Sequence, residues 1–336
     1  MSIEISKPSK LEKCDSVALV SPVNIPPKEY RADDAIIQYL ISIGYNPSTY
    51  IASTDTEKSR VDNFNNAINS GARALLPISG NRYGENILHR LDYEAFERNK
   101  PIYCTFSAAS ALLLALHFRT GVTTFYGPHI SFIHTNATFR ENNFTVNSFW
   151  NTLTGEQGNE ITNIYSRTPV PADSEAIPFI GISNSQTNNT ARGGLLPSFL
   201  QSLERAINNG VEVNFKNRIV IVESDEISFE RAFEIFEQIN SLSNIKDSSV
   251  IILASFITHK KNPPNPKLLR QLYDLHNVEN FRRSVADILG NNVPVIYGFP
   301  MGHLRYKLTI PMGTEAIVNL ETGDITLVES VFSNSK

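Results

Sequence analysis

The sequence predicts an α/β protein with two domains: an N-terminal, doubly wound domain with a mostly parallel sheet, and a C-terminal α/β domain that ends in a small β-unit. Short apolar segments rich in β-branched residues alternate with amphipathic segments along most of the chain. Such alternation is typical of a parallel sheet covered by helices on both faces. The 336 residues suffice for two hydrophobic cores. From residue 308 onward only strand-like segments follow, which predicts the terminal β-unit.

The elements of the N-terminal domain alternate regularly. Apolar runs bounded by Pro or Gly indicate strands, and apolar residues at helical spacing that end before Gly indicate helices. Strands are predicted at 16–21, 74–78, 102–106 and 121–128, and helices at 31–43, 60–70, 91–99 and 108–119.

A linker is predicted at 161–180, which carries three prolines and little periodicity. The N-terminal domain therefore covers 1–160 and the C-terminal domain 181–336. In the C-terminal domain, helices are predicted at 196–207, at 229–239 and in the segment before 289, and strands at 217–223, 249–256, 293–297, 308–311, 315–319 and 325–329.

Composition argues against several classes of function. Hydrophobic residues make up 41% of the chain and charged residues 19%, which is ordinary for a globular protein. With a net charge of −4 and no clustered Lys/Arg face, we expect no nucleic-acid partner. Cys14 and Cys104 are too few for a disulfide framework or a metal site. The longest apolar run, 111–116, is too short to cross a bilayer, and the polar residues 1–14 carry no secretory signal. We therefore expect a cytoplasmic protein without a membrane partner.

Ser107 lies at a sharp junction between a buried strand and an Ala- and Leu-rich helix. A hydroxyl at this position projects from the end of the sheet, beside the free N–H groups of the first helical turn. This is the arrangement of a nucleophile elbow. The alternative from this segment alone is a helix N-cap, a position where Ser is strongly favoured.

Glu223 and His303 also end apolar strands. Nucleophilic acyl transfer needs a hydroxyl, an imidazole that takes its proton and a carboxylate that orients the imidazole. Taken singly, a Glu at the position of Glu223 is most often a solvated strand end, and a His at the position of His303 is most often a surface loop residue. The occurrence of all three side chains at strand ends of one α/β chain favours a hydrolase.

These residues lie within motifs that resemble the serine LD-carboxypeptidase family, which includes the microcin-immunity peptidases. The resemblance extends over nearly the whole chain, and the run 92–128 looks closest to the microcin-immunity branch. The motifs in chain order are Ser21-Pro22, Ser79-Gly80-Asn81, Thr105-Phe106-Ser107-Ala108-Ala109-Ser110, Thr124-Phe125-Tyr126-Gly127-Pro128, Gly193-Gly194-Leu195-Leu196, Ile221-Val222-Glu223 and Pro300-Met301-Gly302-His303.

The resemblance implies a serine hydrolase with a catalytic triad. Ser107 would be the nucleophile, His303 the general base and acid, and Glu223 the residue that orients the imidazole. Because Ser107 and the other two residues belong to different domains, the site is expected in the cleft between them. The resemblance also implies a homodimer, and we expect neither a metal nor another cofactor.

The resemblance further implies an oxyanion hole formed by backbone N–H groups of Ala108 and of the Gly80-Asn81 loop. Three residues depart from the family pattern, because Thr105 and Asn81 replace glycines and Ala108 replaces an aspartate. A backbone donor survives these changes, whereas a contact from the aspartate side chain does not. The departures leave open a second hypothesis, a binding protein that has kept the fold and lost turnover.

The expected substrate is a small peptide-like molecule with a free carboxylate or an aminoacyl group, cleaved at an amide bond through an acyl-enzyme. The resemblance implies two classes: murein tetrapeptide, cut before a terminal D-Ala, and a peptidyl or aminoacyl nucleotide antibiotic. The loops around the nucleophile favour a small conjugate, and acyl transfer or cyclisation on the same scaffold is a further alternative. Arg82 and Arg305 are candidate contacts for a carboxylate, and Tyr126 for a flat part of the ligand. Surface charge and core packing are the competing explanations for these three.

Overall fold

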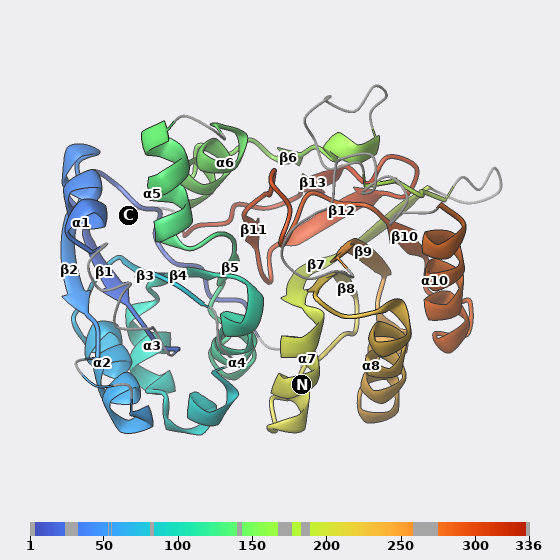
Figure 1. The fold of residues 1–336 in the computed structure, drawn as a ribbon, viewed down its shortest axis with the longest axis horizontal. Helices are drawn as coiled ribbons and strands as arrows, with labels where there is room; N and C mark the ends of the chain where they lie inside the picture. The colour runs from blue at the N-terminus through green and yellow to red at the C-terminus, as the bar shows by residue number, and fades with distance from the viewer. Residues whose placement is uncertain are drawn as a thin grey trace.

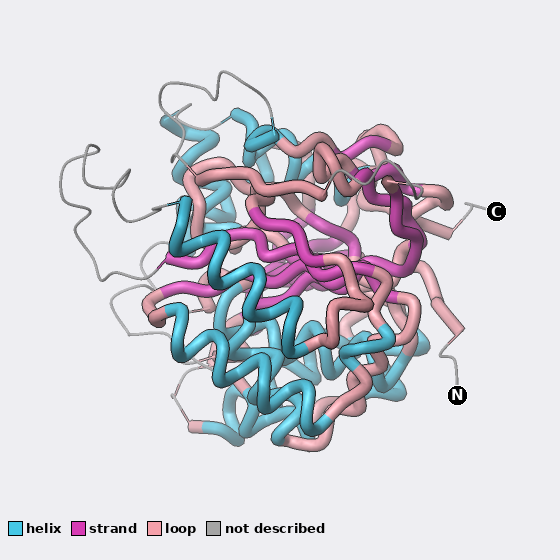
Figure 2. The backbone as a smooth tube through the Cα atoms, turned by 90° about the vertical axis from the view of Figure 1, so that its right-hand side faces the viewer, coloured by secondary structure: helices cyan, strands magenta, loops and turns pink. Residues whose placement is uncertain are grey.

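The computed structural model describes residues 4–23, 33–52, 54, 56–80, 84–139, 143–166, 177–182, 189–257 and 275–333. Two sheets lie next to each other, the N-terminal one in blue and green and the C-terminal one in yellow to red (Figure 1). Seen from the side, the strands form a central layer with helices above and below it (Figure 2). The predicted α/β fold class is confirmed. Within the described ranges, every helix is too short or too polar to span a bilayer.

The first sheet and its helices come mainly from the N-terminal half of the chain. Their bounds are β1 (Ser16–Val20), α1 (Asp33–Ser42), β2 (Asn46–Tyr50), α2 (Glu57–Asn69), β3 (Ala74–Pro77), η2 (Glu85–Arg90), α3 (Tyr93–Asn99), β4 (Ile102–Thr105), η3 (Ser107–Ala109), α4 (Ser110–Thr120), β5 (Phe125–Tyr126), α5 (Ile130–Phe139), α6 (Asn143–Thr154) and β11 (Ile310–Pro311). The strand order is β11-β5-β4-β3-β1-β2, and only β11 runs antiparallel to its neighbour.

Alternate residues of β1 show why this sheet needs helices on both faces. Val17 and Leu19 pack into one core with α1, α5 and α6, whereas Ala18 and Val20 pack into the other with α2, α3 and α4. All four side chains are fully buried. A strand without a solvated face reads as a continuous apolar run, which is how the sequence identified it.

The second sheet carries the remaining elements. Their bounds are β6 (Glu160–Ile161), η4 (Ile164–Ser166), β7 (Thr190–Phe199), α7 (Leu200–Asn208), β8 (Arg218–Asp225), α8 (Phe229–Leu242), η5 (Ile245–Asp247), β9 (Val250–Ile257), α10 (Leu275–Ile288), β10 (Val295–Tyr297), β12 (Glu315–Asn319) and β13 (Ile325–Leu327). The order is β10-β9-β8-β7-β12-β13-β6. Strands β7 to β10 are parallel, and β12, β13 and β6 extend the sheet antiparallel. Of the expected terminal β-unit, β12 and β13 pair with each other, whereas the strand expected at 308–311 joins the first sheet as β11, and β6 was not predicted.

A continuous seam joins the two sheets. Helices α4 and α7 lie next to each other along it, and one apolar core includes residues of both (Figure 1). Strand β11 comes from the C-terminal half but pairs with β5, so that Ile310 lies opposite Tyr126. The domain limits at residues 160 and 180 remain a prediction. The structure shows in addition that β11, from the C-terminal half of the chain, belongs to the sheet of the N-terminal half.

The largest error of the sequence analysis concerns residues 196–207. The helix α7 starts at Leu200, and the preceding residues form the end of β7. Leu195 and Leu196 are both fully buried, so the strand shows no alternation and imitates the start of an apolar helix. Gly193 lies inside this strand, where a Cβ would approach Asn217 O to 2.2 Å. A glycine is therefore needed at position 193 because the backbones of β7 and of Asn217 approach closely there. It does not mark a loop.

Three further elements were not predicted. The edge strand β2 contains Pro47 and is partly exposed along its length, so it lacks an apolar run. Helices α5 and α6 are rich in Asn, Thr and Phe, residues with weak helix propensity. Their formation reflects burial of residues such as Ile133 and Phe149 against the first sheet.

Candidate active site

Ser107 lies two residues after the end of β4 and adopts a left-handed backbone conformation with φ +59°. This conformation is unfavourable for residues other than glycine and is characteristic of strained functional turns. The Ser107 side chain makes no N-cap hydrogen bond, because the residues that precede η3 and α4 are Phe106 and Ala109 and neither helix has a side-chain cap. The geometry thus favours the elbow over the simple cap.

The imidazole of His303 meets the hydroxyl of Ser107 across the seam. Its Nε2 lies 2.9 Å from Ser107 Oγ, although 196 residues separate the two in the chain. The rings of Phe106 and Phe199 flank the imidazole, with centroids 5.3 and 5.5 Å away. These contacts leave the imidazole little freedom to turn away from Ser107.

Glu223 holds the other side of the imidazole. The fully buried carboxylate, on β8, places Oε2 3.0 Å from His303 Nδ1. Because a carboxylate only accepts hydrogen bonds, Nδ1 carries the proton and Nε2 is free to accept the proton of Ser107. Gly302, with φ +94°, makes room for this carboxylate, since a Cβ there would lie 2.4 Å from Glu223 Cδ.

Tyr126 lies behind this chain of hydrogen bonds. Its hydroxyl donates to Glu223 Oε1 at 2.5 Å and accepts the backbone N–H of Ser107 at 3.3 Å. The side chain is 1% exposed. Burial and the neighbouring Glu223 charge raise the pKa of Tyr126 well above its usual value, so the hydroxyl stays a donor. The sequence suggested a substrate contact for Tyr126, but the structure instead gives its hydroxyl to Glu223 and Ser107.

The charge state of His303 follows from these neighbours. Burial disfavours the imidazolium form, but the carboxylates of Glu223 and Asp225 outweigh this effect and raise the pKa of His303 above its usual value. Asp225 is a residue that the sequence analysis missed, and its Oδ2 lies 3.8 Å from Nε2. Its only signal in the sequence was an acidic side chain two positions beyond Glu223.

Thr105, one of the residues that depart from the family pattern, has a structural explanation. Thr105 Oγ1 lies 2.9 Å from Nε2 of the buried His129. Burial and the nearby charge of Lys307 lower the pKa of His129 to about 3, so this imidazole is neutral and acts as a fixed hydrogen-bonding partner. Gly80 packs against the same ring, because a Cβ there would lie 2.3 Å from it. Ala108 is buried, and its carbonyl accepts the Ser202 hydroxyl at 3.1 Å.

The remaining predicted residues are more distant from this chemistry or outside the described part. Asn81 and Arg82 lie outside the described residues. Arg305 is exposed, and its guanidinium lies 5.5 Å from the ring centroid of Tyr306. The oxyanion roles of Ala108 and Gly80 stay predictions. Among the described residues, no group of three His, Cys, Asp or Glu side chains could hold a metal ion.

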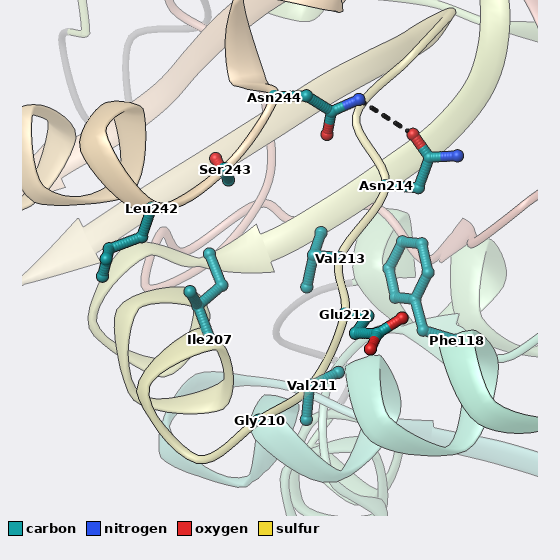
Figure 3. Close-up of a pocket in the computed structure, with 10 residues that line it drawn as sticks. All are labelled: Phe118, Ile207, Gly210, Val211, Glu212, Val213, Asn214, Leu242, Ser243 and Asn244. Carbon is teal, nitrogen blue, oxygen red and sulfur yellow. Dashed lines mark hydrogen bonds between the residues drawn. The ribbon is translucent and has the colours of Figure 1, made fainter.

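A cavity of about 770 Å³ lies at the opposite end of α4 from Ser107 (Figure 3). It is lined by Phe118 near the end of that helix and by residues of the α7 and α8 C-termini, including Ile207 and Leu242. Eleven residues separate Phe118 from Ser107, which corresponds to about 16 Å along a helix. None of the predicted site residues lines this cavity, so we do not include it in the candidate active site around Ser107.

Comparison with known proteins is consistent with this geometry. Residues 17–127 match the LD-carboxypeptidase N-terminal domain, and residues 192–318 match the LD-carboxypeptidase C-terminal domain. A probable murein peptide carboxypeptidase of Bacillus subtilis is 22% identical, over 93% of this chain and 91% of the relative. The microcin C7 self-immunity protein MccF of Escherichia coli is 24% identical, over 88% of this chain and 86% of the relative.

The fold agrees with the same group of proteins. A solved structure of MccF in complex with glutamyl sulfamoyl guanosine superposes with a TM-score of 0.73 at 20% identity, covering 97% of this chain and 99% of that one. The two domain matches together cover most of the chain, in the order and spacing of the family. The protein therefore belongs to the LD-carboxypeptidase family.

Proposed function

We propose that the protein is a serine hydrolase that cleaves an amide bond in a small peptide or aminoacyl conjugate through an acyl-enzyme. Ser107 is the nucleophile, His303 the general base and acid, and Glu223 the residue that orients the imidazole. The observation that carries the proposal is the unbroken hydrogen-bond chain from Ser107 Oγ through His303 to Glu223.

In the first step, His303 Nε2 takes the hydroxyl proton of Ser107 while Oγ forms a bond to the substrate carbonyl carbon. The proton then passes from Nε2 to the leaving nitrogen, and the C–N bond breaks to give an ester on Ser107. A water molecule repeats the sequence, losing its proton to His303 and releasing the acid. The Glu223 carboxylate stabilises the imidazolium that forms in each step.

The negative oxygen of the tetrahedral intermediate needs hydrogen-bond donors. The N–H of Ser107 already donates to the Tyr126 hydroxyl. We therefore assign one donor to the N–H of Ala108, in η3, and the second to a backbone N–H of the Gly80-Asn81 loop. Loss of one such donor typically costs ~10²–10³ in rate.

Two substrate classes follow from the relatives. The Bacillus subtilis relative is named as a murein peptide carboxypeptidase, and MccF has been solved with an aminoacyl sulfamoyl nucleoside. Both ligands present an acyl group attached to nitrogen, with an anionic group on the leaving side. We propose a small conjugate of this kind as the substrate.

A fluorophosphonate probe tests the proposal directly. We expect covalent labelling of the wild-type protein and none of Ser107→Ala, since removal of a nucleophilic serine costs up to ~10⁶ in rate. Incubation with murein tetrapeptide or with glutamyl sulfamoyl guanosine, followed by mass spectrometry, identifies the cleaved class. A folded protein that binds these compounds but is neither labelled nor active would instead be a binding protein on this scaffold.

A further inference from the structure

Asp225 places a second carboxylate beside the imidazole of His303. Its Oδ2 lies 3.8 Å from Nε2, the same nitrogen that contacts Ser107 Oγ at 2.9 Å. Glu223 occupies the opposite side of the ring through Nδ1. Because Nε2 must reach the reacting atoms of the substrate, the Asp225 carboxylate borders the space where the scissile carbonyl binds.

Within the described part of the chain, the charge of Asp225 has little compensation. Among the described residues, no Lys or Arg forms an ion pair with it, and its one cationic neighbour is His303. That imidazole provides a positive charge only when it is protonated, a form that cannot act as a base. Burial of Asp225 raises its pKa, as do the like charges of Glu223 and Glu226. His303 and a backbone hydrogen bond from Glu226 stabilise the charge only in part. A partly buried carboxylate with so little compensation is costly for a fold, and a cation that binds beside it lowers this cost.

The backbone that presents this carboxylate is fixed. Gln201 donates from Nε2 to the Asp225 carbonyl at 2.9 Å, and its Oε1 accepts the Ser224 hydroxyl at 3.2 Å. The next residue, Glu226, turns the chain with φ +59°. A carboxylate that is presented from a fixed backbone is pre-positioned for a ligand, which favours a recognition role.

We propose that Asp225 binds the α-ammonium group of the residue that is transferred to Ser107. The proposal rests on the hydrolase function proposed above and specifies its substrate. An ammonium group on the carbon next to the scissile carbonyl lies two bonds from the carbon that Ser107 attacks, within reach of a carboxylate that contacts His303 Nε2. The leaving side is a poor alternative, because both candidate classes carry negative charge there and Asp225 would repel it.

This assignment separates the two substrate classes. In an aminoacyl conjugate the transferred residue has a free, charged α-amino group. In a murein tetrapeptide the α-nitrogen of the corresponding residue is part of a peptide bond and carries no charge. The structure thus points to aminoacyl conjugates with a free amino terminus as the preferred substrates.

The test compares glutamyl sulfamoyl guanosine with its N-acetyl derivative. The readout is the concentration of each compound that halves the initial rate of fluorophosphonate labelling of Ser107, measured at pH 7 for wild type, Asp225→Asn and the matched control Glu226→Gln. Substrates and inhibitors both compete with the probe, so the assay does not depend on turnover. Loss of a charged hydrogen bond corresponds to about 10- to 100-fold in affinity.

We expect wild type and Glu226→Gln to prefer the free amine by this factor, and Asp225→Asn to bind both compounds alike. A pH profile of labelling separates this role from an effect on the base, because a general electrostatic role would move the His303 titration without changing the preference between compounds. Equal competition by the two compounds in wild type, or none by either, overturns the ammonium site. Absence of labelling altogether overturns the hydrolase proposal instead.

Discussion

Replacement of Tyr126 by Phe removes one hydroxyl from behind the proposed triad and leaves the ring in place. The hydroxyl makes two hydrogen bonds, one to the buried Glu223 carboxylate and one from the Ser107 N–H. A hydrogen bond to a charged group contributes about 1.5–3 kcal/mol, and the elbow bond to Ser107 adds about 1 kcal/mol. We expect the free energy of unfolding to fall by about 2.5–4 kcal/mol. We expect kcat to fall about 10- to 100-fold, the loss typical of a hydrogen-bonding partner that orients a functional side chain.

The pH profile distinguishes a positioning role from simple destabilisation. His303 must be neutral to accept the Ser107 proton, so activity disappears as the pH falls through its raised pKa. Without the Tyr126 donor, the Glu223 charge acts on the imidazole unshielded and raises that pKa further. The acidic limb of the kcat/KM profile, or of the fluorophosphonate labelling rate, should therefore move to higher pH in Tyr126→Phe.

Tyr103→Phe is the matched control. Its hydroxyl is equally buried in the first sheet but has no hydrogen-bond partner among the described residues. Removing it should leave stability unchanged or slightly increased, with an unaltered pH profile. The reasoning about Tyr126 is refuted if both tyrosine variants keep wild-type activity and the same acidic limb.

Three further predictions concern the same residues. Glu223→Gln should lower kcat by ~10³–10⁴ and move the acidic limb to lower pH, because the carboxylate that raises the pKa of His303 is gone; an unchanged limb in the pH–rate profile would contradict this. Gly302→Ala should lower the free energy of unfolding, measured by chemical denaturation, by about 2–4 kcal/mol and remove most of the activity, because the new Cβ overlaps Glu223. Gly210→Ala is the control: its φ is similar but the space around it is open, so the loss should be only about 1–2 kcal/mol. Ser107→Gly should be more stable than Ser107→Ala by about 1 kcal/mol, because only the former relieves the left-handed strain; equal melting temperatures would count against a strained elbow.

The parts of the site that the sequence predicted are those that depend on local rules. Ser107 and His303 follow apolar strands, and Glu223 lies two residues before the end of β8, which the sequence analysis ended at Glu223 itself. Parallel strands bring their carboxyl ends to one edge of a sheet. The two helical layers on the first sheet followed from the same alternation. The distances between Ser107, His303 and Glu223 could not be predicted from the sequence, because they depend on how three strands from two sheets are placed.

The parts that were missed depend on contacts between distant segments. Tyr126 looked like a ligand-stacking residue because nothing in its own segment indicates that β8 brings Glu223 to its hydroxyl. Asp225 gave only a weak signal, since an acidic residue near the end of a strand is usually solvated. The strand β7 was taken for a helix because burial on both faces removes the alternation by which strands are recognised.

Because β11 crosses into the first sheet, the proposed catalysis depends on how the two sheets are aligned. The N-terminal half of the chain carries Ser107, and the C-terminal half carries His303 and Glu223. The pairing of β11 with β5 anchors the segment that follows His303 to the edge of the first sheet. Any displacement of one half against the other would lengthen the Oγ to Nε2 contact while every helix stays intact. On gentle warming, the proposed activity should accordingly be lost at a lower temperature than the secondary structure measured by circular dichroism.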